Sequence, residues 1–179
     1  MSVTKKSMLT AVCLALCVVL PQAFHSIPNA GVIYCPIHIP ILLCGLICGW
    51  KYGLLCGVAG PLFSSLFTGM PSFVYLPQMM IECGIYGMVA GMDLFPMIKS
   101  KWRRYLRLIV AMVCGRVVSG IVRALIFAPG EYSIKLWATG YFLKSLPGIV
   151  IQLVVIPAIV SVLVRSALIP GEDDTTGQS

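Results

Sequence analysis

The sequence predicts an all-α integral membrane protein with six transmembrane helices. Of its 179 residues, 59% are hydrophobic and only 11% are charged, and the mean hydropathy is +0.96. Soluble domains are about 45–50% apolar and about 25% charged, so a soluble core of this size could not bury so much apolar side chain. A spanning helix needs roughly 20 mainly apolar residues, so at most about six or seven crossings fit. We therefore expect the function to lie within the membrane.

Turn signals divide the first half of the chain into apolar segments. The first segment follows Lys5 and Lys6, and because no A-x-A cleavage site follows it, we expect a helix rather than a signal peptide. The second contains Pro40, which a first helical turn tolerates. Turns at Gly49 and Pro71 then separate the second, third and fourth segments.

The second half contains the densest charge run, residues 93–107, which we expect to be the longest polar connection. Pro129 and Gly130 end the fifth segment, and Arg165 follows the sixth. Residues 1–170 thus form one predicted six-helix domain, and residues 171–179 an acidic cytoplasmic tail. The predicted helices are residues 7–24, 37–49, 52–68, 74–91, 108–127 and 141–164.

The positions of the basic residues predict the orientation. Lys and Arg beside short loops stay on the cytoplasmic side of a membrane. With six spans, nearly all the basic residues that flank the segments fall on one side, loops 25–36 and 69–73 contain no Lys or Arg, and loop 129–140 has one Lys against one Glu. Both termini are therefore expected in the cytoplasm. The flanking basic residues are Lys5, Lys6, Lys51, Lys99, Lys101, Arg103, Arg104, Arg107 and Arg165.

Several function classes lack support in the sequence. The net charge of +7 comes from residues beside apolar segments rather than from a basic surface stripe, so we expect no nucleic-acid partner. None of the eight cysteines forms a C-x-x-C pair, and we expect small, buried, reduced thiols and no metal. A P-loop, a zinc-binding H-E-x-x-H helix and a G-x-S-x-G motif are also missing from the sequence. We expect neither an enzyme nor a cofactor.

Charged residues inside apolar segments are costly in a bilayer, so each is a candidate for function. Arg116 and Arg123 are seven residues apart in the fifth segment, which at about 100° per residue places them on one helix face, with Ser119 between them. At about 1.5 Å per residue, Arg123 lies roughly 6 Å and Arg116 roughly 16 Å from the outer end.

The fourth segment carries a second polar face. Gln78, Glu82 and Tyr86 are spaced by four residues, with Tyr75 close to their face. Glu82 lies roughly 12 Å deep, between the depths of the two arginines. One arginine can pair with it, and the other has no acidic partner in any predicted span. A carboxylate or phosphate of a ligand is the natural partner of that second arginine.

Other residues extend this predicted substrate-binding site. Gln152 in the sixth segment reaches a similar depth, and Asn29 and His38 belong to or border the first outer loop. Two alternatives stay open: Arg123 reaches the outer interface while Glu82 pairs structurally with Arg116, and His38 only caps a helix start.

Small residues recur at a spacing that favours close helix packing. Gly45, Gly49, Gly53 and Gly57 are spaced by four, and small residues at this interval let helix backbones approach closely in membranes.

Local motifs in the first three segments are similar to those of a known family. The first segment contains Ala11-x-x-x-Ala15, and the second and third read from Pro36 through Gly45 to the turn Gly49-Trp-Lys51-Tyr-Gly53. These features resemble the alanine motif, Pro-rich entry and G-x-[KR]-x-G turn of the substrate-binding (S) components of energy-coupling factor (ECF) vitamin transporters. The likeness covers about residues 7–166.

The resemblance implies a six-helix S-component bundle in the plasma membrane of a prokaryote. It implies that Ala11 and Ala15 face a transmembrane coupling subunit, that two cytoplasmic ATPases drive transport, and that a vitamin binds in the outer half. The two arginines favour an anionic substrate. The alternatives are a structural or regulatory subunit without a ligand and a small membrane enzyme that acts on a lipid phosphate.

Overall fold

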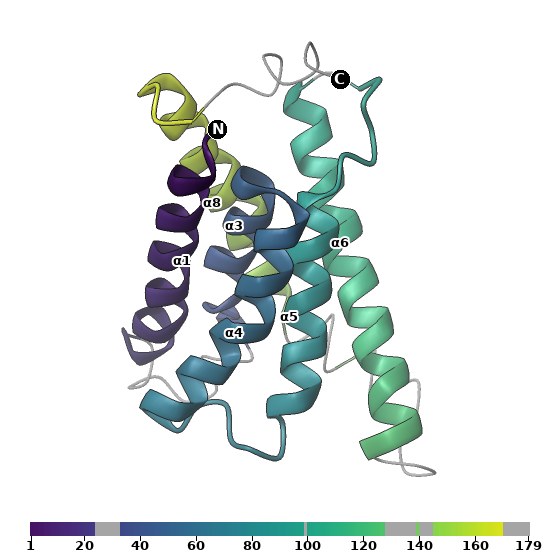
Figure 1. The fold of residues 1–179 in the computed structure, drawn as a ribbon. Coiled ribbons are helices and arrows are strands. Elements are labelled where there is room, and N and C mark those ends of the chain that lie inside the picture. Colours follow the sequence, from purple (N-terminus) through teal and green to yellow (C-terminus); the bar gives the residue numbers. More distant parts are fainter. Residues whose placement is uncertain (24–32, 99, 128–138, 140–144, 170–179) are drawn as a thin grey trace.

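The computed structural model describes residues 1–23, 33–98, 100–127, 139 and 145–169. This part of the chain is helical and contains no β-strand. Helix α6 continues directly into a π-helix, η1 (Arg123–Phe127), and Figure 1 shows the helices packed side by side as a bundle. The predicted all-α class and helix order are confirmed. The α-helices are α1 (Val3–Ala23), α3 (His38–Cys48), α4 (Trp50–Thr68), α5 (Leu76–Gly91), α6 (Ser100–Val122) and α8 (Leu146–Arg165).

Helix α6 begins at Ser100, eight residues earlier than predicted. The charge run does not form a connection up to residue 107, because its arginines pack as helical residues. Arg103 and Arg107, one turn apart, are both buried. Arg107 donates Nε and Nη2 to the carbonyl oxygen of Ala90 at 3.0 and 2.6 Å, which ties the start of α6 to the end of α5.

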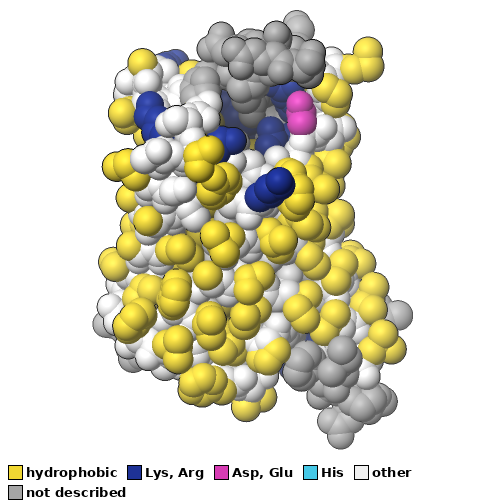
Figure 2. Space-filling view, in the orientation of Figure 1, with side chains coloured by type: hydrophobic (Ala, Val, Ile, Leu, Met, Phe, Trp, Pro, Cys, Tyr) yellow, Lys and Arg dark blue, Asp and Glu magenta, His cyan; other side chains and the backbone are white. Residues whose placement is uncertain are grey.

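Within the described part of the chain, three helices are long and apolar enough to cross a membrane: Val3–Ala23, Trp102–Leu125 and Leu146–Arg165. The shorter α3, with 11 residues, is also apolar. On the face shown in Figure 2, Lys and Arg side chains gather toward the end where α1 begins, and apolar side chains cover much of the remaining described surface. The turn between α4 and α5 lies at the opposite end of the bundle (Figure 1).

Glycines place the backbones of α4 and α5 in direct contact. A Cβ atom on Gly53 would lie 2.6 Å from the carbonyl carbon of Gly87, and one on Gly57 would lie 2.7 Å from Cα of Gly84. Gly45 of α3 faces Gly87 as well. The predicted role of Gly49 in this packing is wrong. Its φ of 94° and the open space where its Cβ would lie show that it forms the turn between α3 and α4.

Helix α1 packs through one face only. Thr10, Cys13 and Cys17 are buried, and a Cβ on Gly60 of α4 would lie 2.9 Å from Sγ of Cys17. All eight cysteines are free thiols, seven of them buried. The opposite face of α1, which includes Val12 and Val19, is left uncovered by the rest of the described chain.

Candidate functional site

Two polar helix faces meet between α5 and α6. The spacing by four on α5 directs Gln78, Glu82 and Tyr86 to one side, and all three are buried. Ser119 of α6, fully buried, faces them. Gly115 allows this approach, because a Cβ at that position would collide with the Tyr86 ring. The two helices therefore enclose a polar cluster inside an otherwise apolar bundle.

Hydrogen bonds connect this cluster in a chain. Ser119 Oγ donates to Oε2 of Glu82 at 3.1 Å, and the Tyr86 hydroxyl donates to Oε1 of Glu82 at 2.7 Å. Gln78 Nε2 donates to Ser119 Oγ at 3.1 Å, while Arg123 Nη1 lies 3.5 Å from Gln78 Oε1. Within the described residues, Glu82 thus accepts its hydrogen bonds from two hydroxyl groups, and Arg123 reaches it only through Gln78 and Ser119.

Arg116 is the deepest cation of the cluster. It is 2% exposed, and its Cζ lies 5.8 Å from the centroid of the Tyr86 ring, a distance typical of a cation–π contact. Its Nη2 donates to Ser145 Oγ at 3.3 Å, just before α8 begins. The His38 ring packs edge-on against the same Tyr86 ring, with centroids 4.9 Å apart. Tyr86 therefore joins the carboxylate, a cation and an imidazole.

Gln152 of α8 approaches the cluster from the other side. Its Nε2 donates to the carbonyl oxygen of Cys35 at 3.4 Å, and the backbone N–H of His38 donates to the same oxygen at 3.1 Å. Cys35 adopts a left-handed backbone with φ of 47°, which is uncommon outside glycine. Burial raises the pKa of the Cys35 thiol to about 12, so this thiol stays neutral at physiological pH.

Two buried polar atoms flank Cys35 without a hydrogen-bond partner among the described residues. They are Nδ1 of His38 and Oε1 of Gln152, on side chains that are 6% and 0% exposed. A buried polar group without a partner costs about 1–3 kcal/mol, so such atoms are suited to receive a ligand or an ordered water.

The described structure brings together most of the predicted site: Gln78, Glu82, Arg116, Ser119, Arg123, His38 and Gln152. Tyr75 lies at the edge, 54% exposed, with its ring 5.8 Å from Cζ of Arg123. Asn29 lies outside the described residues. Tyr86 was predicted on the same polar face as Glu82 but not among the substrate-binding residues. The predicted site also did not include Cys35 and Ser145, which no sequence pattern singles out.

Ala11 and Ala15 occupy the exposed face of α1. They lie on the side away from Thr10, Cys13 and Cys17, and both are uncovered by the described chain. A helix face that presents small side chains allows the backbone of another helix to approach closely.

A family model described as "ECF transporter, substrate-specific component" matches residues 5–160, which is well over half of the chain. No curated protein and no solved structure matches this chain.

Proposed function

Since the chain belongs to the family of substrate-specific components of ECF transporters, we propose that it captures a small anionic micronutrient, such as a vitamin, for ATP-driven uptake. The family is one of transporter components rather than of enzymes. The observation that carries the proposal is the buried cluster of Arg116, Glu82 and Tyr86 between α5 and α6, with Arg123 linked to it through Gln78.

The charges of the cluster favour an anionic substrate. Two arginines and one glutamate belong to it, so its side chains carry an excess of one positive charge when ionised. Guanidinium groups bind carboxylates and phosphates through paired hydrogen bonds, and such charge-assisted bonds are about twice as strong as neutral ones. A carboxylate or phosphate on the substrate would balance this charge.

The two buried polar atoms beside Cys35 that lack a hydrogen-bond partner among the described residues suggest a second contact region for the substrate. Oε1 of Gln152 accepts hydrogen bonds, and Nδ1 of His38 either accepts or donates, depending on the tautomer. A substrate that carries an N–H or O–H group several bonds from its anionic group fits both regions. Asn29 and Tyr75 are proposed to complete the outer part of the site.

The uncovered face of α1 suggests how the chain assembles. Components of this family work with a transmembrane coupling subunit and two ATPases. We assign the contact with the coupling subunit to Ala11 and Ala15, because both are small and exposed. The gathering of basic side chains at the end where α1 begins supports an orientation with both termini in the cytoplasm, and we propose the plasma membrane of a prokaryote as the location.

Mass spectrometry of the protein purified in mild detergent tests the proposal. We expect a co-purified anionic micronutrient, and we expect its readdition to raise the melting temperature, since a ligand that binds only the folded state stabilises it. If no small molecule co-purifies and none of a panel of vitamins shifts the melting temperature, the chain acts as a structural subunit instead. Conversion of a lipid phosphate by the purified chain alone would favour an enzyme.

A further inference from the structure

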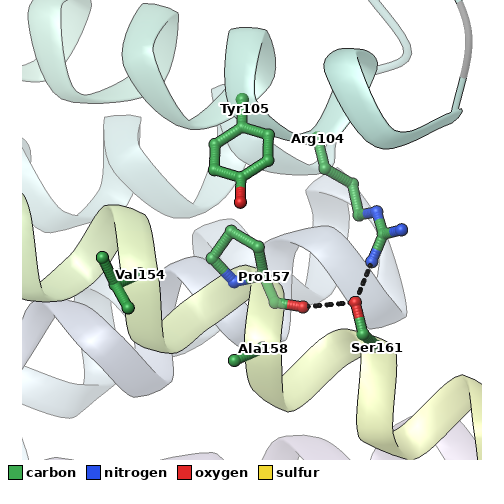
Figure 3. Close-up of a pocket in the computed structure, with 6 residues that line it drawn as sticks. All are labelled: Arg104, Tyr105, Val154, Pro157, Ala158 and Ser161. Atoms are coloured by element: carbon green, nitrogen blue, oxygen red, sulfur yellow. Dashed lines mark hydrogen bonds between the residues drawn. The ribbon is translucent and has the colours of Figure 1, made fainter.

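A cavity of about 200 Å³ lies between α6 and α8, lined by residues outside the polar cluster. Its lining combines cationic, hydroxyl and apolar side chains, which Figure 3 shows as sticks. At about 30 Å³ per water-sized group, it accommodates a phosphate group and a few methylenes rather than a whole lipid. The lining residues are Arg104, Tyr105, Val154, Pro157, Ala158 and Ser161.

One end of the cavity is polar. Arg104 reaches from α6 toward α8 and donates Nη1 to Ser161 Oγ at 3.1 Å, and Ser161 Oγ in turn donates to the carbonyl oxygen of Pro157 at 2.7 Å (Figure 3). Tyr105 points its hydroxyl toward Pro157 in the same view. A guanidinium held beside a serine hydroxyl, with a tyrosine hydroxyl lining the same cavity, is a favourable environment for a phosphate.

The other end of the cavity is apolar and lies deeper along the bundle. Val154 precedes Ser161 by seven residues on α8, a rise of about 10 Å. Because α8 ends at Arg165, toward the end where the basic side chains gather, Ser161 lies nearer that end than Val154. Trp102, 69% exposed, and Tyr105, 39% exposed, provide aromatic rings of the kind enriched at membrane interfaces. The polar end thus lies at headgroup level and the apolar end at acyl-chain level.

We propose that this cavity binds an anionic phospholipid of the leaflet at the basic end of the bundle. The lipid phosphate occupies the end formed by Arg104, Ser161 and Tyr105, and one acyl chain lies along Val154 and Ala158. A lipid with a neutral glycerol headgroup, which leaves the phosphate charge uncompensated, fits better than a zwitterionic one, because an ammonium group would lie among the basic side chains near the start of α6. This site is separate from the proposed substrate site and does not depend on it.

Native mass spectrometry of the full chain in detergent tests the site with two probes, dioleoylphosphatidylglycerol and dioleoylphosphatidylcholine. We expect the wild-type protein to retain one phosphatidylglycerol about tenfold more tightly than phosphatidylcholine. Arg104→Gln should remove this preference. Lys5→Gln is the matched control, because it removes one positive charge at the same end of the bundle but on α1, and it should preserve the preference.

The apolar end is tested separately with Ala158→Phe, which fills the cavity and leaves Arg104 in place. The control Val150→Phe adds the same ring to an exposed position of α8 outside the lining. We expect phosphatidylglycerol retention to fall in Ala158→Phe and to persist in Val150→Phe. Equal retention of both lipids by the wild type, equal loss in Arg104→Gln and Lys5→Gln, or full retention in Ala158→Phe would overturn the proposal.

Discussion

The hydroxyl of Tyr86 donates a 2.7 Å hydrogen bond to Oε1 of Glu82, one helical turn earlier on α5. Both side chains are buried, and Ser119 of α6 supplies the second hydrogen bond to the carboxyl group. A buried carboxyl group depends on such donors, because it has lost its hydration.

Tyr86→Phe removes one of these two donors and preserves the ring. We expect the free energy of unfolding to fall by about 1–3 kcal/mol, the cost of leaving a buried polar group without a partner. Thermal unfolding in detergent should show this as a lower melting temperature. Tyr75→Phe, at an exposed tyrosine, is the control and should unfold like the wild type. Equal melting temperatures for the two variants would contradict the role of the Tyr86 hydroxyl.

Arg116→Ala and Arg123→Ala should each weaken substrate binding by on the order of 2–3 kcal/mol, since each removes a charge-assisted hydrogen-bond donor. Isothermal titration with the co-purified micronutrient measures the loss. Arg165→Ala, at an exposed arginine at the opposite end of the bundle, should bind normally. Unchanged affinity in both site variants would refute the site assignment. The melting temperature of each ligand-free variant checks that the fold persists.

Ala11→Trp and Ala15→Trp should abolish uptake and leave substrate binding unchanged. A large ring on the exposed face of α1 keeps a partner helix at a distance without disturbing the buried face. Cellular uptake and binding by the purified chain are measured in parallel. Val162→Trp changes a comparably exposed position on α8 and should keep uptake. Normal uptake in both alanine variants would show that the coupling subunit docks elsewhere.

Gly53→Ala should destabilise the bundle by about 1–3 kcal/mol, because the new Cβ meets the Gly87 carbonyl group and Cα of Gly45, which are backbone atoms. Thermal unfolding should show a melting temperature lower by several degrees, at about 2–4 °C per kcal/mol for a chain of this length. Gly84→Ala is the control. Its Cβ meets only side-chain ends of Leu54 and Val58, at 3.3 Å, so the loss should be small. Equal losses would argue against backbone contact as the cause.

Cysteine labelling in intact cells tests the proposed orientation. Ser72→Cys lies in the turn between α4 and α5 and should react with a membrane-impermeant maleimide from outside. Ser2→Cys, at the opposite end, should react only after permeabilisation. Seven native thiols are buried and Cys114 lies within α6, so the unsubstituted chain gives the background. The reverse pattern would place the termini outside.

The all-α class and the order of the helices followed from the sequence, because apolar runs bounded by Pro and Gly limit where a spanning helix can start and end. The start of α6 was missed because dense charge suggested a connection, whereas Arg107 bonds to Ala90 and extends the helix. Gly49 was misassigned because a spacing of four does not distinguish a packing glycine from one that forms a turn.

Helical spacing predicted which residues of the site share a helix face. Spacing places Gln78 and Glu82 on one face and Arg116, Ser119 and Arg123 on another, but it does not determine which side chains touch. Glu82 was expected to pair with an arginine, and in the described structure it bonds to two hydroxyl groups. Cys35 and Ser145 precede helices and reach the cluster through tertiary folding, which no local pattern reveals.

The glycine contact between α4 and α5 constrains how this bundle can move. With Gly53 against Gly87 and Gly57 against Gly84, the two backbones interlock, and neither helix can slide or rotate along the other without a steric clash. Helices α4 and α5 therefore form one rigid unit. A tilt of this pair would carry Glu82 and the turn between α4 and α5 together, so the distance between them would be preserved.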